Sequence, residues 1–165
     1  MKRTASMMLY SSIILLVLFL TACHTDKEIT LSVDDIPGKI LTDMNRSYPG
    51  AEVEEYSKEY EDGSWSYEIE FMFEGQEHEV KYSLDGTLIE SERATTIEAL
   101  PATVTRLLNS DYKSYSVEKI EEITQNGKIF YEVELIKSDG KGGLELVFSP
   151  DGQLISSEIE DGDED

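Results

Sequence analysis

Apolar residues follow a helical period in two short segments of the chain. Each segment carries apolar side chains at positions i, i+4 and i+8 and a proline near its start. This pattern is typical of an amphipathic helix with proline in its first turn. The apolar positions are Ile36, Ile40 and Met44 in one segment and Leu100, Val104 and Leu108 in the other.

Each predicted helix is followed by stretches in which apolar and polar residues alternate, the period of a half-buried strand. Asp-Gly or Asn-Gly pairs separate these stretches and favour tight hairpins. The sequence therefore predicts four antiparallel strands after each helix. The strand signals lie at 53–60, 67–73, 78–84 and 88–89, and again at 117–124, 131–135, 144–148 and 154–155.

The two halves share this order because they resemble one another residue by residue. "YSLDGTLIESE" at 82–92 returns as "FSPDGQLISSE" at 148–158, and other matches lie 64 residues apart. We interpret the chain as a tandem duplication, with repeats at residues 31–94 and 95–160. The predicted fold class is α+β, each repeat packing one N-terminal helix on its own four-stranded antiparallel sheet. Units of this size have small cores, so we expect the repeats to support each other.

The first residues have the character of a targeting segment. Lys2 and Arg3 precede an apolar run from Met7 to Leu20, which is too short to span a bilayer comfortably. The run ends in Leu20, Thr21, Ala22 and Cys23, which resembles the bacterial lipoprotein signal. We predict that residues 1–22 are a signal peptide, that Cys23 is acylated, and that 23–30 form a lipidated tether. The alternative is a chance cysteine after an ordinary signal peptide.

This targeting signal predicts that the protein lies in the cell envelope, outside the cytoplasm. His24 follows Cys23 where aspartate would favour retention in the inner membrane, and Asp26-Lys27-Glu28 resembles surface-export signals of some Bacteroidetes. Both features favour the outer membrane or the cell surface. Cys23 is the single cysteine, so once acylated it leaves no disulfide and no thiolate chemistry. More than one acyl chain would make the attachment durable.

The chain is strongly acidic, with a formal net charge of −21. Losing Lys2 and Arg3 with the signal would leave 12 of the 14 basic residues against all 35 acidic ones, a net charge of −23. Such a field repels phosphate backbones and anionic lipid surfaces, which argues strongly against nucleic acid as a partner and against membrane binding through the protein surface. It favours cationic partners, divalent ions or simple solubility. Residues 161–165 are interpreted as a solvated acidic tail.

The residues that could carry catalysis are few. His24 lies in the predicted tether, and His78 is in phase with Val80 and Tyr82, which predicts a histidine at the edge of the core. No nucleophile is spaced to pair with it. We predict a protein without enzymatic activity and without a cofactor.

The strand period also predicts which residues face away from the helices. If Ile69 and Val133 face the core, their neighbours form a carboxylate-rich face with a few apolar residues, suited to a basic protein or peptide. A solvated sheet face is the alternative. A third is cation binding, although the spacing lacks the calcium-loop pattern, so no metal site is assigned. The candidate face comprises Glu68, Glu70, Glu77, Glu79, Lys81, Phe130, Glu132, Glu134, Glu145 and Val147.

The motif order "IP…YPG…V…DG…YEIE…EVKYSLDGTLIESE", with its second copy, resembles the PepSY-like family, also described as β-lactamase-inhibitor-like. The resemblance covers nearly all of the chain after Cys23. It implies tandem domains of an exported bacterial protein, and its motifs are signatures of a fold with no catalytic set. Related secreted inhibitors hold an enzyme against an open sheet face. We therefore expect a lipid-anchored envelope module that binds a protein or peptide; the alternatives are a cation-binding or purely structural lipoprotein.

Replacing Cys23 by Ala tests the predicted anchor. Without the thiol that accepts the lipid, the protein should lose labelling by a radioactive or clickable fatty acid and move from the membrane fraction to the soluble one. His24→Ala serves as the control and should leave both unchanged. Full membrane retention of the Cys23→Ala protein would show that the anchor is not a lipid on this residue.

Overall fold

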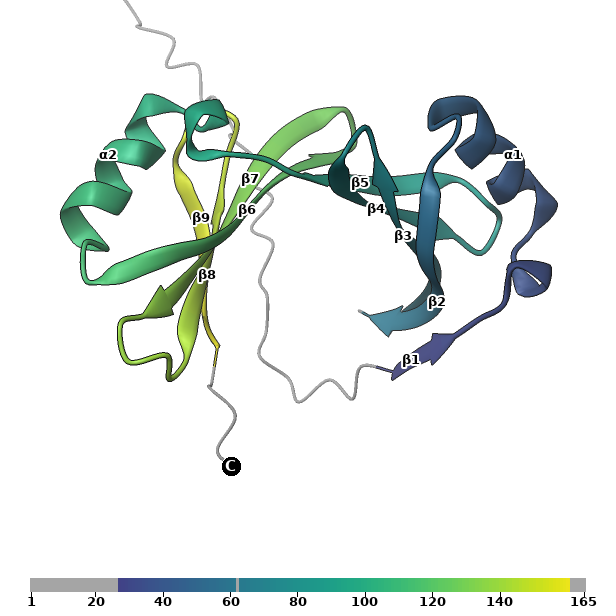
Figure 1. Ribbon diagram of the computed structural model, residues 1–165, viewed down its shortest axis with the longest axis horizontal. Helices are drawn as coiled ribbons and strands as arrows, with labels where there is room; N and C mark the ends of the chain where they lie inside the picture. Colours follow the sequence, from purple (N-terminus) through teal and green to yellow (C-terminus); the bar gives the residue numbers. More distant parts are fainter. Residues whose placement is uncertain (1–26, 62, 161–165) are drawn as a thin grey trace, which may run out of the picture.

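A computed structural model of the protein describes residues 27–61 and 63–160, except the side chain of Glu160. Within these residues, two helices and nine strands follow one another, with a 3₁₀ turn before each helix (Figure 1). In chain order they are β1 (Lys27–Thr30), η1 (Val33–Asp35), α1 (Gly38–Ser47), β2 (Glu52–Glu61), β3 (Ser64–Phe73), β4 (Gln76–Ser83), β5 (Leu88–Ala94), η2 (Ile97–Ala99), α2 (Ala102–Asp111), β6 (Tyr115–Gln125), β7 (Lys128–Lys137), β8 (Gly143–Phe148) and β9 (Leu154–Glu160).

All nine strands form one antiparallel sheet in sequence order, β1 to β9. The prediction of two helix-on-four-strand units, each with its own sheet, is therefore wrong. β5 extends to Ala94, well beyond the expected Leu88-Ile89, and pairs with β6 from Glu90↔Gln125 to Ala94↔Glu121. The longer strand presents backbone groups along its whole edge, and an unpaired edge tends to recruit another strand. Here β6 is that strand.

The edge strand β1 was not anticipated either. Residues 27–30 belong to the segment that the sequence analysis assigned to a tether, and they pair with β2 from Lys27↔Tyr60 to Thr30↔Ser57. Strand pairing rests on backbone hydrogen bonds, so this polar segment can pair without burying its side chains. Cys23 and its signal, residues 1–22, the rest of the tether and the tail at 161–165 lie outside the described residues.

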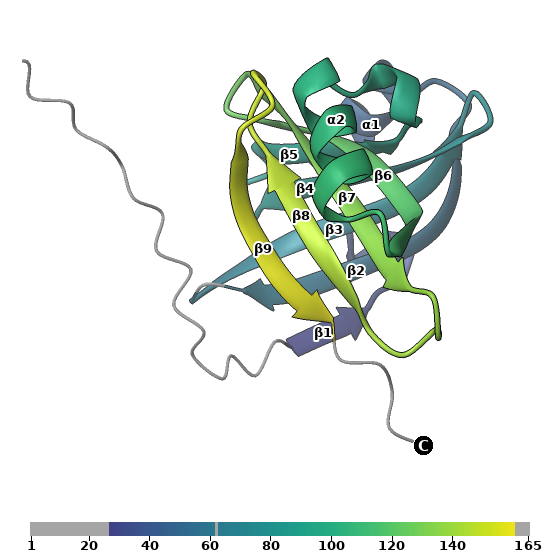
Figure 2. The ribbon, with the colours of Figure 1, turned by 90° about the vertical axis from the view of Figure 1, so that its left-hand side faces the viewer.

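Both helices cover the same face of the sheet, at its two ends (Figures 1 and 2). The apolar positions that predicted the helices are all buried under them. None of the described helices is long and apolar enough to cross a membrane. The core under α1 contains Ile36, Ile40, Met44, Ile69, Phe71, Val80 and Tyr82. The core under α2 contains Leu100, Val104, Leu108, Ile120, Val133, Leu135, Leu146 and Phe148.

The last hairpin turn docks against the start of α2. Thr103 Oγ1 donates to the carbonyl oxygen of Asp151 at 3.4 Å, and Gly152 has a φ of +79°. A Cβ added at Gly152 would overlap Thr103 Oγ1. Glycine is therefore required here twice, for its backbone conformation and for the space that it leaves.

Gly152→Ala and Gly127→Ala form a matched pair that separates these two requirements. Gly127 also has a positive φ, of 72°, but a Cβ there meets nothing within 4 Å. Gly127→Ala should cost about 1–2 kcal/mol of unfolding free energy from backbone strain. Gly152→Ala should cost a further ~1–3 kcal/mol because Thr103 must move. Urea denaturation measures both; equal losses would contradict the docked turn.

Candidate functional site: the open face of the sheet

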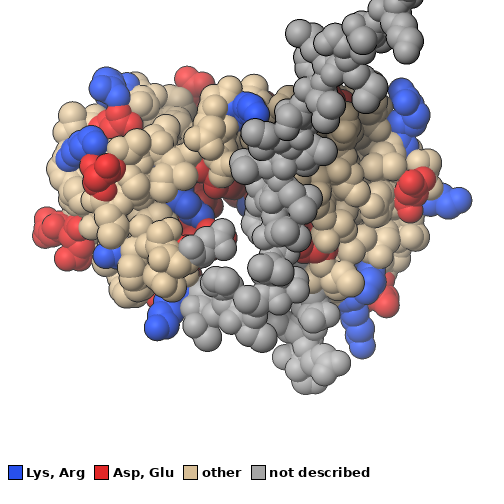
Figure 3. Space-filling view, turned by 180° about the vertical axis from the view of Figure 1, so that it is seen from behind, with Lys and Arg blue, Asp and Glu red and all other residues tan. Residues whose placement is uncertain are grey.

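We call the sheet face opposite α1 and α2 the open face. Because the sheet is continuous, this face runs across all nine strands without interruption. The molecule is hollowed between the two ends of the sheet, and acidic and basic side chains border the hollow (Figure 3). The predicted face residues from the two halves therefore belong to one surface.

Glutamates stand directly across from one another on this face. Glu79 of β4 lies between Glu70 of β3 and Glu92 of β5. Further along the sheet, Glu121 pairs with Glu132, and Glu145 lies between Glu134 and Glu158. Like charges directly opposite on a sheet repel each other. The open face therefore carries an acidic band that crosses both halves. It comprises Glu68, Glu70, Glu79, Glu92, Glu121, Glu132, Glu134, Glu145 and Glu158.

Two lysines partly neutralise the acidic band. Lys81 Nζ lies 3.1 Å from Glu59 Oε2, 3.2 Å from Glu61 Oε2 and 3.5 Å from Glu68 Oε2. Burial opposes the charge of Lys81, but Glu61 and Glu59 raise its pKa above the ordinary value. Lys119 Nζ lies 2.9 Å from Glu121 Oε2. Acidic groups remain in excess around both lysines.

The band is less exposed than strand alternation predicts. Glu70 is exposed as expected, but Glu68, Glu132 and Glu134 are half-buried. The Glu68 side chain is only 14% exposed to solvent. On the helix face, Ile69 and Val133 are buried as predicted. The hollow explains the difference, because a hollowed face brings side chains of distant strands together and reduces their contact with water.

Burial and crowding raise the pKa of five of these carboxyl groups, Glu70 among them, and the rise is large in the other four. Burial, then repulsion by Glu79, raises the pKa of Glu68 to about 8. Burial, then Glu92, raises that of Glu79 to about 7. The pKa of Glu92 rises to about 8 through burial and Glu90, and that of Glu132 to about 8 through burial and Glu145. The band is thus only partly ionised near neutral pH.

Apolar side chains adjoin the acidic band in the second half. Ile123 lies directly across from Phe130, and Val147 directly across from Glu132. Ile123 is buried, whereas Phe130 and Val147 are half-buried. The face thus offers a contact surface that is both acidic and apolar.

A small cavity of about 130 Å³ opens where β5 ends between β4 and β6. Glu77 and Glu79 contribute from β4, and Lys119 and Glu121 from β6. His78 also borders this cavity, but its ring stacks on Phe71 with centroids 5.4 Å apart. Burial and Arg93 lower the pKa of His78, which favours the neutral ring. This is a histidine at the edge of the core, as predicted.

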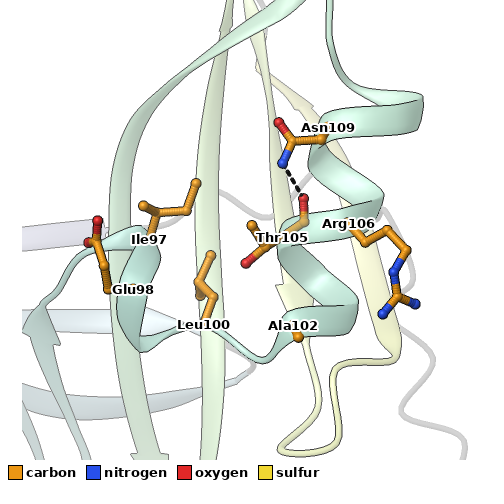
Figure 4. Close-up of a pocket in the computed structure, with 7 residues that line it drawn as sticks. All are labelled: Ile97, Glu98, Leu100, Ala102, Thr105, Arg106 and Asn109. Atoms are coloured by element: carbon orange, nitrogen blue, oxygen red, sulfur yellow. Dashed lines mark hydrogen bonds between the residues drawn. The ribbon is translucent and has the colours of Figure 1, made fainter.

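A larger, shallow cavity of about 550 Å³ lies beside α2 (Figure 4). Ile97, Leu100, Thr105 and Arg106 are among the residues that line it, and the Arg106 side chain extends away from the other three. Asn109 Nδ2 donates to the carbonyl oxygen of Thr105 at 2.8 Å, so this amide is engaged within the helix. A ligand site usually has several polar groups that point to one place in the cavity. The polar groups beside this cavity do not converge in that way, so we do not assign a site to it.

The sequence analysis missed several members of the open face. Glu90 and Glu92 lie on β5, whose length was underestimated, and period-two alternation over residues 88–94 would have found them. Lys119, Glu121 and Ile123 alternate in the same way on β6. No local signal marks Glu59 and Glu61 as partners of Lys81, because their contact depends on the order of strands.

The fold agrees with what known proteins show. The family model described as "Putative beta-lactamase-inhibitor-like, PepSY-like" matches residues 23–90 and 66–156. The chain belongs to this family. The description compares the fold with that of β-lactamase inhibitors. No curated protein matches the sequence.

Three solved structures share the fold. A DUF2874 family protein from Bacteroides uniformis has a TM-score of 0.63 and 18% identity, covering 75% of this chain and 89% of that one. A protein described as "putative periplasmic" from Bacteroides eggerthii has a TM-score of 0.64 and 16% identity, covering 74% and 88%. A BLIP-like protein from Bacteroides fragilis has a TM-score of 0.58 and 20% identity, covering 78% and 90%.

The raised carboxyl pKa values predict that the protein is more stable in mild acid. A carboxyl group whose pKa is raised on folding stabilises the fold fully below its unfolded pKa and loses that contribution as pH rises through the folded value. The ordinary value is 4.5 and the folded values are about 7 to about 8. The melting temperature should therefore fall as pH rises from about 5 to about 9.

Glu92→Gln tests the origin of this slope. Glu92 faces Glu90, Glu121, Glu132 and Lys81, and an amide cannot ionise against these carboxylates. The variant should flatten the fall of melting temperature with pH. Glu158→Gln, on the exposed edge strand of the same face, is the control and should keep the wild-type slope. Parallel slopes for wild type and Glu92→Gln would contradict the assignment.

Proposed function

We propose that this protein is a non-enzymatic, lipid-anchored binding module of the cell envelope that holds a protein or peptide against the open face. The observation that carries this proposal is the continuity of that face across nine strands. A surface of this breadth suits a macromolecular partner better than a small molecule. Family membership supports a binding role, and the periplasmic description of a protein with the same fold supports an envelope location.

The chemistry of the open face favours a partner with basic and apolar side chains. Glu77, Glu134 and Glu145 lie on this face from β4, β7 and β8, and they would attract lysine or arginine of a partner. Phe130 and Val147 would contact apolar side chains. Charged rims mainly set the rate of association and choose among partners, whereas apolar contacts contribute more of the affinity.

The lipid on Cys23 would hold this face outside the cytoplasm. Cys23 lies four residues before β1, so the anchor joins the sheet at its β1 edge. An attached module searches for partners in a thin layer beside the membrane. This raises their effective concentration without any new contact.

Charge reversal on the open face tests the proposal. Residues 24–165 include every described helix and strand, so this soluble fragment is suitable bait. Glu77→Lys, Glu134→Lys and Glu145→Lys together should abolish recovery of envelope proteins that wild type retains at low salt. Recovery should weaken as salt rises, because exposed charges are screened beyond about 10 Å at 0.1 M salt.

The matched control reverses three exposed acidic residues on the helix side, Asp34, Glu98 and Asp111. It changes the net charge by the same amount but leaves the open face intact, so recovery should stay at the wild-type level. Circular dichroism checks that both variants fold. Equal recovery by the two folded variants would mean that the partner does not bind the open face.

A further inference from the structure

Three carboxylates of the acidic band converge closely in the first half of the sheet. One carboxylate oxygen from each of Glu68, Glu70 and Glu79 lies within 4.8 Å of the others. Glu70 and Glu79 stand directly across from one another on adjacent strands, so the backbone pairing holds them together. Carboxylate oxygens at such separations suit a hard divalent cation, which coordinates oxygen ligands.

A buried hydroxyl beside these carboxylates has no partner. Ser57 is 2% exposed, and its Oγ makes no hydrogen bond in the described part of the chain. Ser57 lies directly across from Glu68, so the pleat directs both side chains to the open face. A buried polar group without a partner is costly and requires an explanation. A cation or its bound water beside Glu68 would provide the missing partner.

Lys81 does not fill the role of this cation. Its Nζ is nearer to Glu59 and Glu61, at 3.1 and 3.2 Å, than to Glu68, at 3.5 Å. Its single charge is therefore shared among three carboxylates, two of which lie outside the cluster. The three carboxyl groups of the cluster thus outnumber the positive charges beside them.

A second triad provides an internal comparison. Glu121, Glu132 and Glu134 also approach within 4.8 Å of one another. Glu121 lies 64 residues after Ser57 and directly across from Glu132, as Ser57 lies across from Glu68. Glu121 therefore occupies the position in the second triad that Ser57 occupies in the first. Its carboxylate is already paired with Lys119, at 2.9 Å. The first triad is the better candidate because its hydroxyl still needs a partner.

We propose that Ser57, Glu68, Glu70 and Glu79 form a binding site for one Ca²⁺ ion on the open face. Calcium fits better than magnesium, because it accepts six to eight oxygens in irregular geometry, whereas magnesium demands a near-ideal octahedron. Water from the hollow would complete the shell. The residues reversed in the capture experiment lie outside this site, so failure of the calcium site can be told apart from failure of the proposed function.

Calorimetric titration of the 24–165 fragment with CaCl₂ tests the site. Wild type should bind one ion per chain, and Ca²⁺ should raise the melting temperature more than NaCl of equal ionic strength. Glu79→Gln and Ser57→Ala should each weaken binding at least about tenfold, the loss typical when even an outer partner of a metal ligand is removed. Magnesium should bind more weakly than calcium.

Glu158→Gln and Glu134→Gln are the controls. Glu158 lies outside both triads, and Glu134 belongs to the second, so neither change should alter calcium binding. Glu70→Gln replaces Glu79→Gln if circular dichroism shows that the latter is unfolded. Identical melting shifts in Ca²⁺ and NaCl, or loss of binding in Glu134→Gln but not in the Glu79 or Glu70 variant, would overturn the assignment.

Discussion

Backbone pairing between β5 and β6 makes one surface out of two halves. Five residue pairs, from Glu90↔Gln125 to Ala94↔Glu121, connect strands that would otherwise be edges. Arg93 reinforces the seam on the helix side by donating to both carboxylate oxygens of Glu122, at 3.2 and 3.0 Å. Because the ladder fixes the register of both halves, it also decides which glutamates meet across the seam. Without it, Glu92 would not approach Glu121.

The two faces of the sheet contribute differently to the stability of the fold. The helix face holds two separate apolar cores, one under each helix, and burial of these side chains supplies the main stabilisation. The open face gathers carboxylates that repel one another and lose contact with water, which opposes folding. Groups that oppose folding are often found at functional sites, which supports the proposed binding role of this face. Burial on the helix face therefore offsets the repulsion on the open face, because the same strands carry both sets of side chains.

Because the acidic band is only partly buried, its carboxylates can bind several different ligands. A half-buried carboxylate can bind a proton, a lysine, a metal ion or a basic side chain of another protein, and each relieves the same repulsion. Lys81 and Lys119 already relieve part of it from within the chain. These ligands would compete for the band, so its state depends on pH, salt and partner together. Such competition follows from like charges held at fixed positions by a rigid sheet.

Much of the local structure could be predicted from the sequence, because it depends on short-range rules. The period of Ile40 and Met44 predicted α1, strand alternation assigned Ile69 and Val133 to the core, and Asn126-Gly127 predicted a hairpin whose φ angles are indeed both positive. Only the tertiary structure decided that there is one sheet, that polar β1 joins it, and that Ser57 lies buried beside Glu68. The physical reason is that pairing between strands uses backbone groups common to every residue. Side-chain patterns therefore reveal that a strand exists and which face it buries, but not which strand lies beside it.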